Sequence, residues 1–558
     1  MTVWKGLLFA AVFVFIAFAL LNPNPFGNNP DIIFDESYFL TSALSAIEHT
    51  TLPGWDFPAS GTYYGGPQTY VDTAVLVPVV GAVLALSDFS IVAAKIWVAG
   101  NTGELLYILR LVSGVGALAT LLFFFFYFKK REIRGPLALS LVLFLFLLLS
   151  NVLVIEFLHT AKVWVFYIIM VAAMSAVFIA NEYYLSRLNT PFMRTERYTA
   201  LLVWSGVLVF FQSYVGVFSI ALLTLYALLL RHISVHDLLG HLRRYWYLIV
   251  LFALTQISFL YQGYKISGNF SDVSTKTAEG TIDWATRLGK PLLFALQSQP
   301  LVILYVAGVL AILFLALSKR AFFDTPRKRM YLAIACAHPV LVYVIFHVII
   351  GFDILPRYAI LLTLACAFSA AILMSELGTK AAVAALALSG MLFLAVGVQA
   401  ITLYWQPSSE TVLLQTIIRN YNTSDTAFIV DHSARRLTLP VNADSLDLLD
   451  EERRQMSRFV FLLQNRDRLP ASDFKPLTAT AYRAEQEAAY IAQLSDTHSI
   501  WMVRTLCTKR CGAGEVAAGT CFEINMNACE KMPHEINTLP EFLGATQLGY
   551  SYVVRKVR

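Results

Sequence analysis

Two adjacent carboxylates, Asp35 and Glu36, follow the first long apolar run of this 558-residue chain. A carboxylate can remove a proton from a hydroxyl group that attacks a reactive carbon, which is general-base catalysis. An acidic residue at the start of a helix also has a structural use, because it caps free amides and complements the helix dipole. Asp35 precedes a helix-like run, 36–49, so the sequence leaves both roles open.

Aromatic and polar side chains follow this acidic pair: Trp55, Asp56, Tyr63, Tyr64, Gln68, Tyr70 and Asp72. The apolar faces of sugar rings stack on aromatic side chains, while sugar hydroxyls bond to carboxylates and amides. Tyrosine and tryptophan also anchor proteins at membrane interfaces, and the two readings are about equally favoured. We expect Asp56, Tyr63, Tyr64 and Asp72 to contact a sugar or an acceptor.

Glu156 and His159 stand one helical turn apart at the end of a later apolar run, and Lys162 follows them. A Glu-x-x-His pair can ligate a divalent metal, although a single pair more often forms a polar lid at a helix end. Glu156 and His159 are therefore the candidate ligands for a divalent metal. The sequence indicates no other cofactor. His159 is also a candidate for acceptor binding. The ammonium group of Lys162 suits a lipid phosphate.

Arg357 lies in a short turn before a late apolar run and is followed by Tyr358. A guanidinium can bind a phosphate through two parallel hydrogen bonds. It can also pair with Asp353 of the same turn or extend its charge toward water. Arg357 and Tyr358 are therefore candidates for contact with a lipid phosphate.

Hydrophobic residues make up 57% of the chain and charged residues 14%, and the mean hydropathy is +0.63. This balance excludes a soluble enzyme, because the chain cannot cover its surface with polar groups. The elements that position the candidate residues must be membrane-spanning helices of about 20 residues. Apolar runs of this kind lie at 4–21, 105–128, 137–157, 163–181, 246–262, 291–317, 331–350, 358–375 and 381–403. The run 199–230 is interrupted at 212–214 and predicts two short helices, which brings the number of spans to eleven.

Short basic loops test this arrangement, and they lie at 129–134, 187–197, 231–244 and 319–329. All four fall on one side when 70–100 lies on the outer surface, and basic loops mark the cytoplasmic side. The segment 22–104 is then a long exterior loop within a membrane domain, 1–403. The net charge of +5 reflects this topology, so no nucleic-acid partner is expected. We expect a plasma (inner) membrane protein with a cytoplasmic N-terminus.

Residues 404–558 are charged and polar, and eleven crossings make them a soluble extracytoplasmic domain. Short strand-like runs alternate with helix-like runs in this part, which predicts an α/β fold. The strand-like runs are 427–430, 500–503 and 550–554, and the helix-like runs are 410–421 and 484–494.

Four of the six cysteines cluster in this domain: Cys507, Cys511, Cys521 and Cys529. An even number of cysteines in an oxidising compartment predicts disulfides, and three pairings are open. A zinc site is the competing reading, but the spacing lacks paired C-x2-C knuckles. Cys336 and Cys366 lie in apolar runs and are expected to be inert thiols.

The acidic pair after the first span, the long exterior loop and the Pro356-Arg357-Tyr358 stretch resemble a known superfamily. The chain is similar to the GT-C polyprenyl-phosphate-sugar glycosyltransferases, especially the protein O-mannosyltransferase and lipid A aminoarabinose transferase branch. The resemblance covers roughly residues 1–375. It implies a polytopic α-helical membrane protein of GT-C type, to which the C-terminal extracytoplasmic α/β domain is added. The implied partners are a polyprenyl-phosphate-linked sugar donor and a glycan, lipid or protein acceptor.

The resemblance also implies roles for particular residues. Asp35 becomes the catalytic base, and Glu36 supports it or contacts the acceptor. Lys162 and Arg357, with Tyr358, stabilise the phosphate that leaves when an acceptor hydroxyl attacks the anomeric carbon with inversion. Such a reaction requires no nucleotide-binding motif.

Two alternatives remain. An O-antigen-ligase-like transferase would use a lipid pyrophosphate donor and depend on arginine and histidine in a late exterior loop, where this chain has only the segments 263–290 and 351–357. A lipid or sugar transporter would place charges at mid-membrane depth, or show broken helices and two similar halves. The sequence indicates neither feature.

Overall fold

The computed structural model describes most of the helical part of the chain and selected segments of the remainder. The described helical part comprises residues 36–53, 66–100, 102–129, 135–158, 163–212, 216–261, 284–318, 325–349 and 358–406. Beyond it, the described residues are 409, 412, 416, 426–430, 438–439, 456–457, 499–504, 510–524, 538–547 and 551–557. The first predicted span, 4–21, therefore lies outside the described residues.

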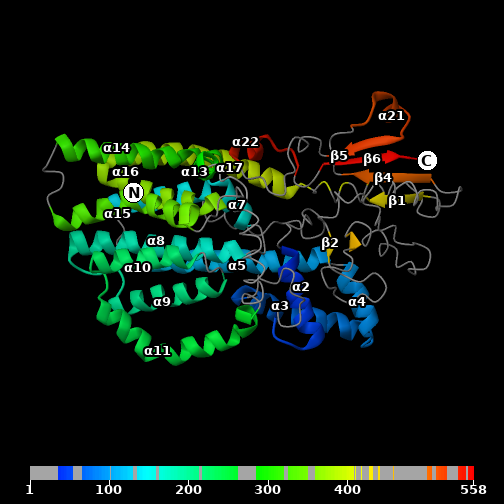
Figure 1. Ribbon diagram of the computed structural model, residues 1–558, viewed down its shortest axis with the longest axis horizontal. Coiled ribbons are helices and arrows are strands. Elements are labelled where there is room, and N and C mark those ends of the chain that lie inside the picture. The colour runs from blue at the N-terminus through cyan, green and yellow to red at the C-terminus, as the bar shows by residue number, and fades with distance from the viewer. Residues whose placement is uncertain are drawn as a thin grey trace.

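A bundle of long helices runs along the longest axis of the molecule (Figure 1). Its helices are α5 (Thr102–Lys129), α6 (Pro136–Leu149), α7 (Val152–Leu158), α8 (Val163–Leu188), α9 (Thr195–Gln212), α10 (Val217–Leu229), α11 (Val235–Thr255), α13 (Trp284–Ser298), α14 (Ile303–Ser318), α15 (Pro326–Tyr343), α16 (Ala359–Leu377) and α17 (Thr379–Trp405). Within the described residues, six helices are long and apolar enough to cross a membrane, or seven if α6 and α7 form one bent span. A helical membrane protein is confirmed, whereas the number eleven stays a prediction.

Helix α16 forms the centre of the bundle. Every residue from Ala359 to Met374 is buried, as expected for a helix that is apolar on all sides. It packs against α6, α14, α15 and α17. Small residues permit these close approaches, since a Cβ atom at Gly308 of α14 would lie 2.9 Å from the Cβ of Leu373.

Two predicted spans are interrupted in the structure. The run 137–157 is divided into α6 and α7, which meet at an angle of 74°. The run 291–317 is divided into α13 and α14, with a single 3₁₀ turn, η1 (Pro300–Val302), between them. Both interruptions have the same cause. The apolar runs contain the polar residues Ser150, Asn151 and Gln299, and the side chains of Asn151 and Gln299 bond to backbone groups that would bond to each other in a continuous helix.

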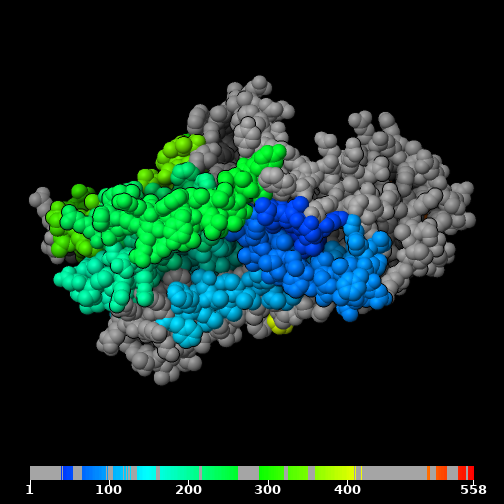
Figure 2. Space-filling view, turned by 90° about the horizontal axis from the view of Figure 1, so that it is seen from below, coloured from blue at the N-terminus to red at the C-terminus, as the bar shows by residue number. Residues whose placement is uncertain are grey.

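The predicted exterior segment forms three helices at one end of the bundle, α2 (Glu36–His49), α3 (Pro67–Leu86) and α4 (Ile91–Gly100). In Figure 2 these helices, in blue, form one mass that continues the bundle along its long axis. Helix α2 has the predicted bounds 36–49. Helix α3 is long and apolar enough to span a membrane, yet it packs across α2, α4, α5 and α9. Its surface position in the membrane stays a prediction.

A close contact fixes the start of α3 against the end of α9. Gly66 precedes α3 with φ of 100°, and a Cβ atom there would lie 2.4 Å from the carbonyl oxygen of Phe211. Only glycine fits this position. The backbone N–H of Gln68 donates to the side chain of Gln212 at 2.9 Å, which closes the same contact.

At the opposite end of the bundle, two of the predicted basic loops, 231–244 and 319–329, meet at one buried carboxylate. Glu182 of α8 accepts two hydrogen bonds of 2.8 Å from Nε and Nη2 of Arg327, at the start of α15. His232, in the α10–α11 turn, is bonded to the same carboxylate at 2.8 Å. Because Glu182 is almost fully buried, losing Arg327 would leave an uncompensated charge.

Four described strands form a mixed sheet in the C-terminal part, in the order β1-β4-β6-β5. They are β1 (Thr426–Val430), β4 (Ser499–Arg504), β5 (Cys521–Ile524) and β6 (Tyr552–Lys556). Strands β1 and β4 are parallel, while β6 runs antiparallel to both β4 and β5. Three of these strands match the predicted strand-like runs. A separate antiparallel pair joins β2 (Thr438–Leu439) to β3 (Met456–Ser457). The α/β class stays a prediction, because the predicted helix-like runs lie almost wholly outside the described residues.

Helix α22 (Leu539–Gly544) connects this C-terminal part to the bundle. The ring of Phe542 is buried in a cluster with Val396 and Leu403 of α17 and Ile155 of α7. The side-chain amide of Gln399 donates to the carbonyls of Phe542 at 3.0 Å and Ala545 at 2.6 Å. These contacts attach the C-terminal part at a second point, besides its covalent link to α17.

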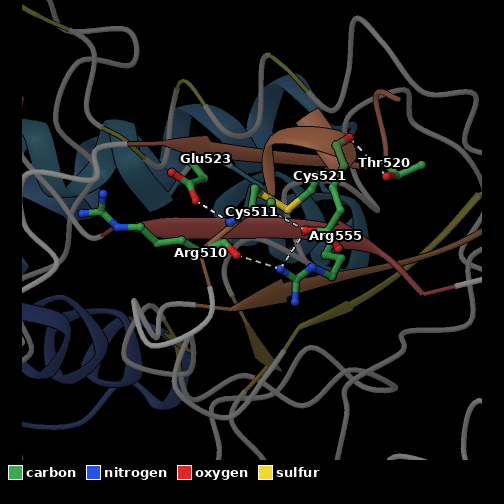
Figure 3. The surroundings of a disulfide bond; sticks show 8 residues. Arg510, Cys511, Thr520, Cys521, Glu523 and Arg555 are labelled. Carbon is green, nitrogen blue, oxygen red and sulfur yellow. Dashed lines mark hydrogen bonds and ion pairs between the residues drawn. A yellow bond between two sulfur atoms is a disulfide. The ribbon is translucent and has the colours of Figure 1, made fainter. Parts of the chain in front are cut away.

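A disulfide joins Cys511 to Cys521 and closes a small loop around α21 (Ala513–Ala517) (Figure 3). The backbone N–H of Cys511 donates to Glu523 at 2.6 Å. Arg555 of β6 donates to the carbonyl of Arg510 at 2.9 Å and pairs with Glu515 at 3.1 Å. The prediction of a disulfide is confirmed for this pair, whereas Cys507 and Cys529 lie outside the described residues.

The pairing of the four clustered cysteines can be mapped by mass spectrometry after digestion without reductant. We expect a peptide linked through Cys511 and Cys521, and a second one linked through Cys507 and Cys529, which is the pairing that remains. Cys336 and Cys366 should be recovered as free thiols and serve as the internal control. Linkage of Cys511 to Cys507 or Cys529 would contradict the structure.

The environment of His232 predicts a pH dependence of stability. Burial lowers the pKa of His232 below its ordinary value, because it disfavours the imidazolium more than Glu182 favours it. Below a pH of about 6.5, the unfolded chain therefore binds a proton that the folded protein does not, and stability falls as the pH falls. Thermal unfolding in detergent should show a larger loss between about pH 7.5 and 5.5 for the wild type than for His232→Gln. The same loss in both proteins would contradict a neutral His232.

Candidate active site at the broken end of the bundle

Helices α6 and α7 are separated by Ser150 and Asn151, two buried polar residues. Asn151 caps α7, because its side-chain oxygen accepts from the backbone N–H of Leu153 at 3.0 Å. Its amide nitrogen donates to the hydroxyl of Thr363 in α16 at 2.7 Å. Asn151 therefore begins a new helix and joins it to the bundle centre.

Gln299 satisfies the other side of the break. This residue lies between α13 and η1, and its side-chain amide donates to the carbonyl of Leu147 at 2.7 Å and to the hydroxyl of Ser150 at 2.8 Å. A backbone group without a partner is costly inside a bilayer. The break between α13 and η1 therefore supplies, through Gln299, hydrogen-bond donors for the break between α6 and α7.

Helix α7 is a short helix in which all seven residues are buried. Six of them are apolar, and the seventh is Glu156, which is 7% exposed. Helix α7 packs against α5, α6 and α8. Because of the bend of 74°, α7 and its residue Glu156 do not continue along the axis of α6 but lie across the end of the bundle.

Three aromatic rings bring the beginnings of α8 and α16 together beside α7. The ring of Trp164, at the start of α8, stacks on Phe157 of α7 with centroids 5.6 Å apart. The same indole meets the ring of Tyr358 edge to face at 5.8 Å. Tyr358 directly precedes α16 and is half-buried. This Phe157–Trp164–Tyr358 group is called the aromatic triad below.

The turn between α9 and α10 supports the aromatic triad from the side. Tyr167 meets Trp164 edge to face at 5.8 Å, and its hydroxyl bonds to Ser219 of α10 at 2.9 Å. Gly216 allows this approach, because a Cβ atom there would lie 2.5 Å from the ring of Tyr167. The predicted division into two helices agrees with α9 and α10, whereas the segment 213–215, in which most of the predicted turn falls, lies outside the described residues.

The structure describes four of the predicted site residues, Glu36, Asp72, Glu156 and Tyr358. Glu36 is the first residue of α2, Glu156 directly precedes Phe157 of the aromatic triad, and Tyr358 is itself a member of the triad. The other predicted residues lie outside the described residues: Asp35, Asp56, Tyr63, Tyr64, His159, Lys162 and Arg357. Lys162 lies two residues before Trp164 in the sequence, and Arg357 lies directly before Tyr358.

Asp72 occupies the packed face of α3. It is 1% exposed and follows the helical spacing of the buried residues Thr69, Leu76 and Val83. Its Oδ2 atom has no hydrogen-bond partner among the described residues. Asp72 thus faces neighbouring helices, and its role as an acceptor contact stays a prediction.

No group of three histidine, cysteine, aspartate or glutamate side chains in the described residues could hold a metal ion. The predicted pair of Glu156 and His159 is described only for Glu156, which lies in the last turn of α7. The metal at this pair stays a prediction.

Three polar residues of this end were missed by reasoning from the sequence: Asn151, Gln299 and Thr363. A local signal exists for Asn151, because Ser150-Asn151 is the single polar pair within the apolar run 137–157 before Glu156. No local signal identifies Gln299 as its companion, since 149 positions separate the bonded residues Ser150 and Gln299.

The arrangement can place polar groups at an end of the bundle that is otherwise apolar. A carboxylate on α7 and the first residue of α2 can act on protons, while the segments preceding α8 and α16 carry the cations Lys162 and Arg357. Comparison with family models, with curated proteins and with solved structures finds no significant match.

The break between α6 and α7 can be tested through Gln299. In Gln299→Leu the carbonyl of Leu147 loses the amide donor that bonds it across the break, which should cost about 1–3 kcal/mol. The midpoint of thermal unfolding in detergent should fall relative to the wild type. Thr402→Val is the matched control, because the exposed Thr402 hydroxyl bonds only to the carbonyl of Val398 in its own helix. Equal midpoints for the two variants would show that the break does not need Gln299.

Proposed function

We propose that this protein is an integral membrane glycosyltransferase that uses a polyprenyl-phosphate-linked sugar. The sugar moves with inversion to a hydroxyl group of a glycan, lipid or protein acceptor. The reaction takes place at the end of the bundle that carries α2, α7 and the aromatic triad. The proposal rests on the chemistry of the predicted residues and on the helices that begin beside them.

The contact between Trp164 and Tyr358 is the observation that carries the proposal. It joins the beginnings of α8 and α16 with ring centroids 5.8 Å apart. Each beginning is immediately preceded in sequence by one of the two predicted phosphate-binding cations, Lys162 or Arg357. Two cations that converge on one phosphate would stabilise the charge that develops on it as it leaves.

The start of α2 supports the assignment of the acid pair. Helix α2 begins at Glu36, so Asp35 directly precedes its first turn. One turn later, Phe39 is fully buried in the hydrophobic cluster that also contains Phe157 and Trp164. In Figure 1, α2 and α7 lie toward the same end of the bundle. An acidic pair at the first turn of α2 is thus carried by a helix anchored in the bundle core.

The proposed reaction is balanced without a nucleotide or a redox partner. The acceptor oxygen forms a bond to the anomeric carbon while the bond from that carbon to the phosphate oxygen breaks. Asp35 takes the hydroxyl proton, and the polyprenyl phosphate leaves with the electron pair. Lys162 and Arg357 stabilise the leaving phosphate, and Glu36 orients Asp35 or the acceptor.

Two independent signals support an extracytoplasmic site. Two basic loops, which mark a cytoplasmic side, meet at Glu182 at one end of the bundle. The sheet that carries the Cys511–Cys521 disulfide extends beyond the other end, where α2 and α7 also lie (Figure 1). Disulfides persist in oxidising compartments. Both signals support the proposal that the site lies at the outer face.

The role of Asp35 can be tested with purified protein in lipid and a panel of labelled polyprenyl-phosphate sugars. Asp35→Asn should lower transfer roughly a hundredfold or more, because the amide cannot accept the hydroxyl proton. Asp88→Asn is the matched control, since Asp88 is an exposed residue of the same exterior segment and asparagine tolerates its φ of 51°. Wild-type turnover in Asp35→Asn would refute the assigned base.

The broken helix favours a second candidate, a lipid or sugar transporter, because discontinuous helices are typical of transporter binding sites. The two activities differ in the fate of the bond between sugar and phosphate. A transferase breaks it, whereas a transporter moves the intact donor between leaflets of a proteoliposome. Movement of intact donor that is unchanged in Asp35→Asn would favour the transporter. Consumption of a pyrophosphate donor alone would favour the ligase-like reaction.

A further inference from the structure

A cavity of about 350 Å³ lies at the end of the bundle opposite the proposed site. Its walls come from the start of α6, the end of α8, the start of α15 and the end of α16. A volume of this size falls within the usual range of sites for small molecules, roughly 300–1,000 Å³. The cavity therefore has room for a ligand that the proposed transfer reaction does not use.

The cavity wall changes from apolar to cationic toward the end of the bundle. On α8 the lining residues Ile179, Glu182, Tyr183, Ser186 and Arg187 recur at helical spacing, so that one face of the helix leads from an isoleucine to an arginine. Leu137 of α6 and Ile372 of α16 line the apolar part. This layout matches an amphiphile with a charged headgroup near the helix ends.

Three cations and two carboxylates line the cavity, and the carboxylates are held by partners. Glu182 is bonded to Nε and Nη2 of Arg327, which leaves the Nη1 donors of that guanidinium unused by this bond. Glu376 lies 3.9 Å from Lys328. Arg187 is exposed, lies over the ring of Tyr183 at 5.1 Å, and forms no ion pair with a described carboxylate.

We propose that this cavity binds the phosphate group of an anionic membrane lipid. Arg187 and the free side of Arg327 donate to the phosphate, Lys328 adds a charge at the mouth, and the acyl chains follow the apolar wall. Glu182 acts as a positioning residue, because its two bonds fix the plane of the Arg327 guanidinium. Basic pockets between spanning helices on the cytoplasmic side are typical sites for such headgroups.

The test compares lipid retention in native mass spectrometry after purification and addition of phosphatidylglycerol or phosphatidylcholine. The wild type should retain phosphatidylglycerol in preference to phosphatidylcholine. Arg187→Gln and Lys328→Gln should each weaken this retention about tenfold, the usual effect of losing one charged hydrogen bond. Arg197→Gln is the matched control, because it removes an exposed arginine of the same basic group that does not line the cavity.

Equal retention in Arg187→Gln, Lys328→Gln and Arg197→Gln would overturn the site. A parallel titration with inorganic phosphate distinguishes the source of the group. Failure of millimolar phosphate to displace the lipid supports the headgroup, whereas binding of phosphate without lipid retention would overturn the lipid. The result is independent of the transfer assay, so either proposal can fail alone.

Discussion

The need to satisfy backbone groups inside a membrane governs the arrangement of the bundle. When α6 ends at Leu149, the carbonyls of its last turn lose their helical partners, and water is not there to replace them. Gln299 bonds to Leu147 and Ser150, while Asn151 starts α7 and bonds to Thr363. Because these partners come from two other segments, the junction between α13 and η1 and helix α16, the bend of α7, the interruption before α14 and the position of α16 are interdependent. Glu156 and Phe157 of the aromatic triad both lie in α7, so their positions depend on this break.

The two ends of the bundle use buried polar groups differently. At the end of α7, neutral amides and hydroxyls satisfy the broken backbone. At the other end, the charge of Glu182 is balanced by Arg327, and its carboxylate also bonds to His232. These bonds join the α10–α11 turn and the start of α15 to α8. The first arrangement determines the direction of α7, and the second holds two loops against α8.

Much of the helical part could be predicted from the sequence, because long apolar runs specify their own helices. Helix α2 has the predicted bounds, and α5, α8, α16 and α17 lie close to theirs. The Ser150-Asn151 pair is a local signal for the first break, but its companion Gln299 could not be predicted, since the bonded residues Ser150 and Gln299 are 149 positions apart. The residue types of the candidate site followed from chemistry, and Tyr358 proved to meet Trp164. Glu182 could not be predicted for a different reason. The basic loops are evident in the sequence, whereas the carboxylate to which their residues bond lies inside α8.

The docking of α22 has a mechanical consequence. A domain that continues from a single helix can swing freely about one covalent link. Here Phe542 is buried against α17 and α7, and Gln399 holds two carbonyls at the end of α22. With two separate attachments, the C-terminal part has less freedom to rotate about α17 than a domain held by one covalent link. The same cluster contains Ile155, which directly precedes Glu156 in α7. The seat of α22 and the α7 turn that carries Glu156 therefore share one hydrophobic cluster, so that a substitution at Phe542 would also remove packing beside this carboxylate.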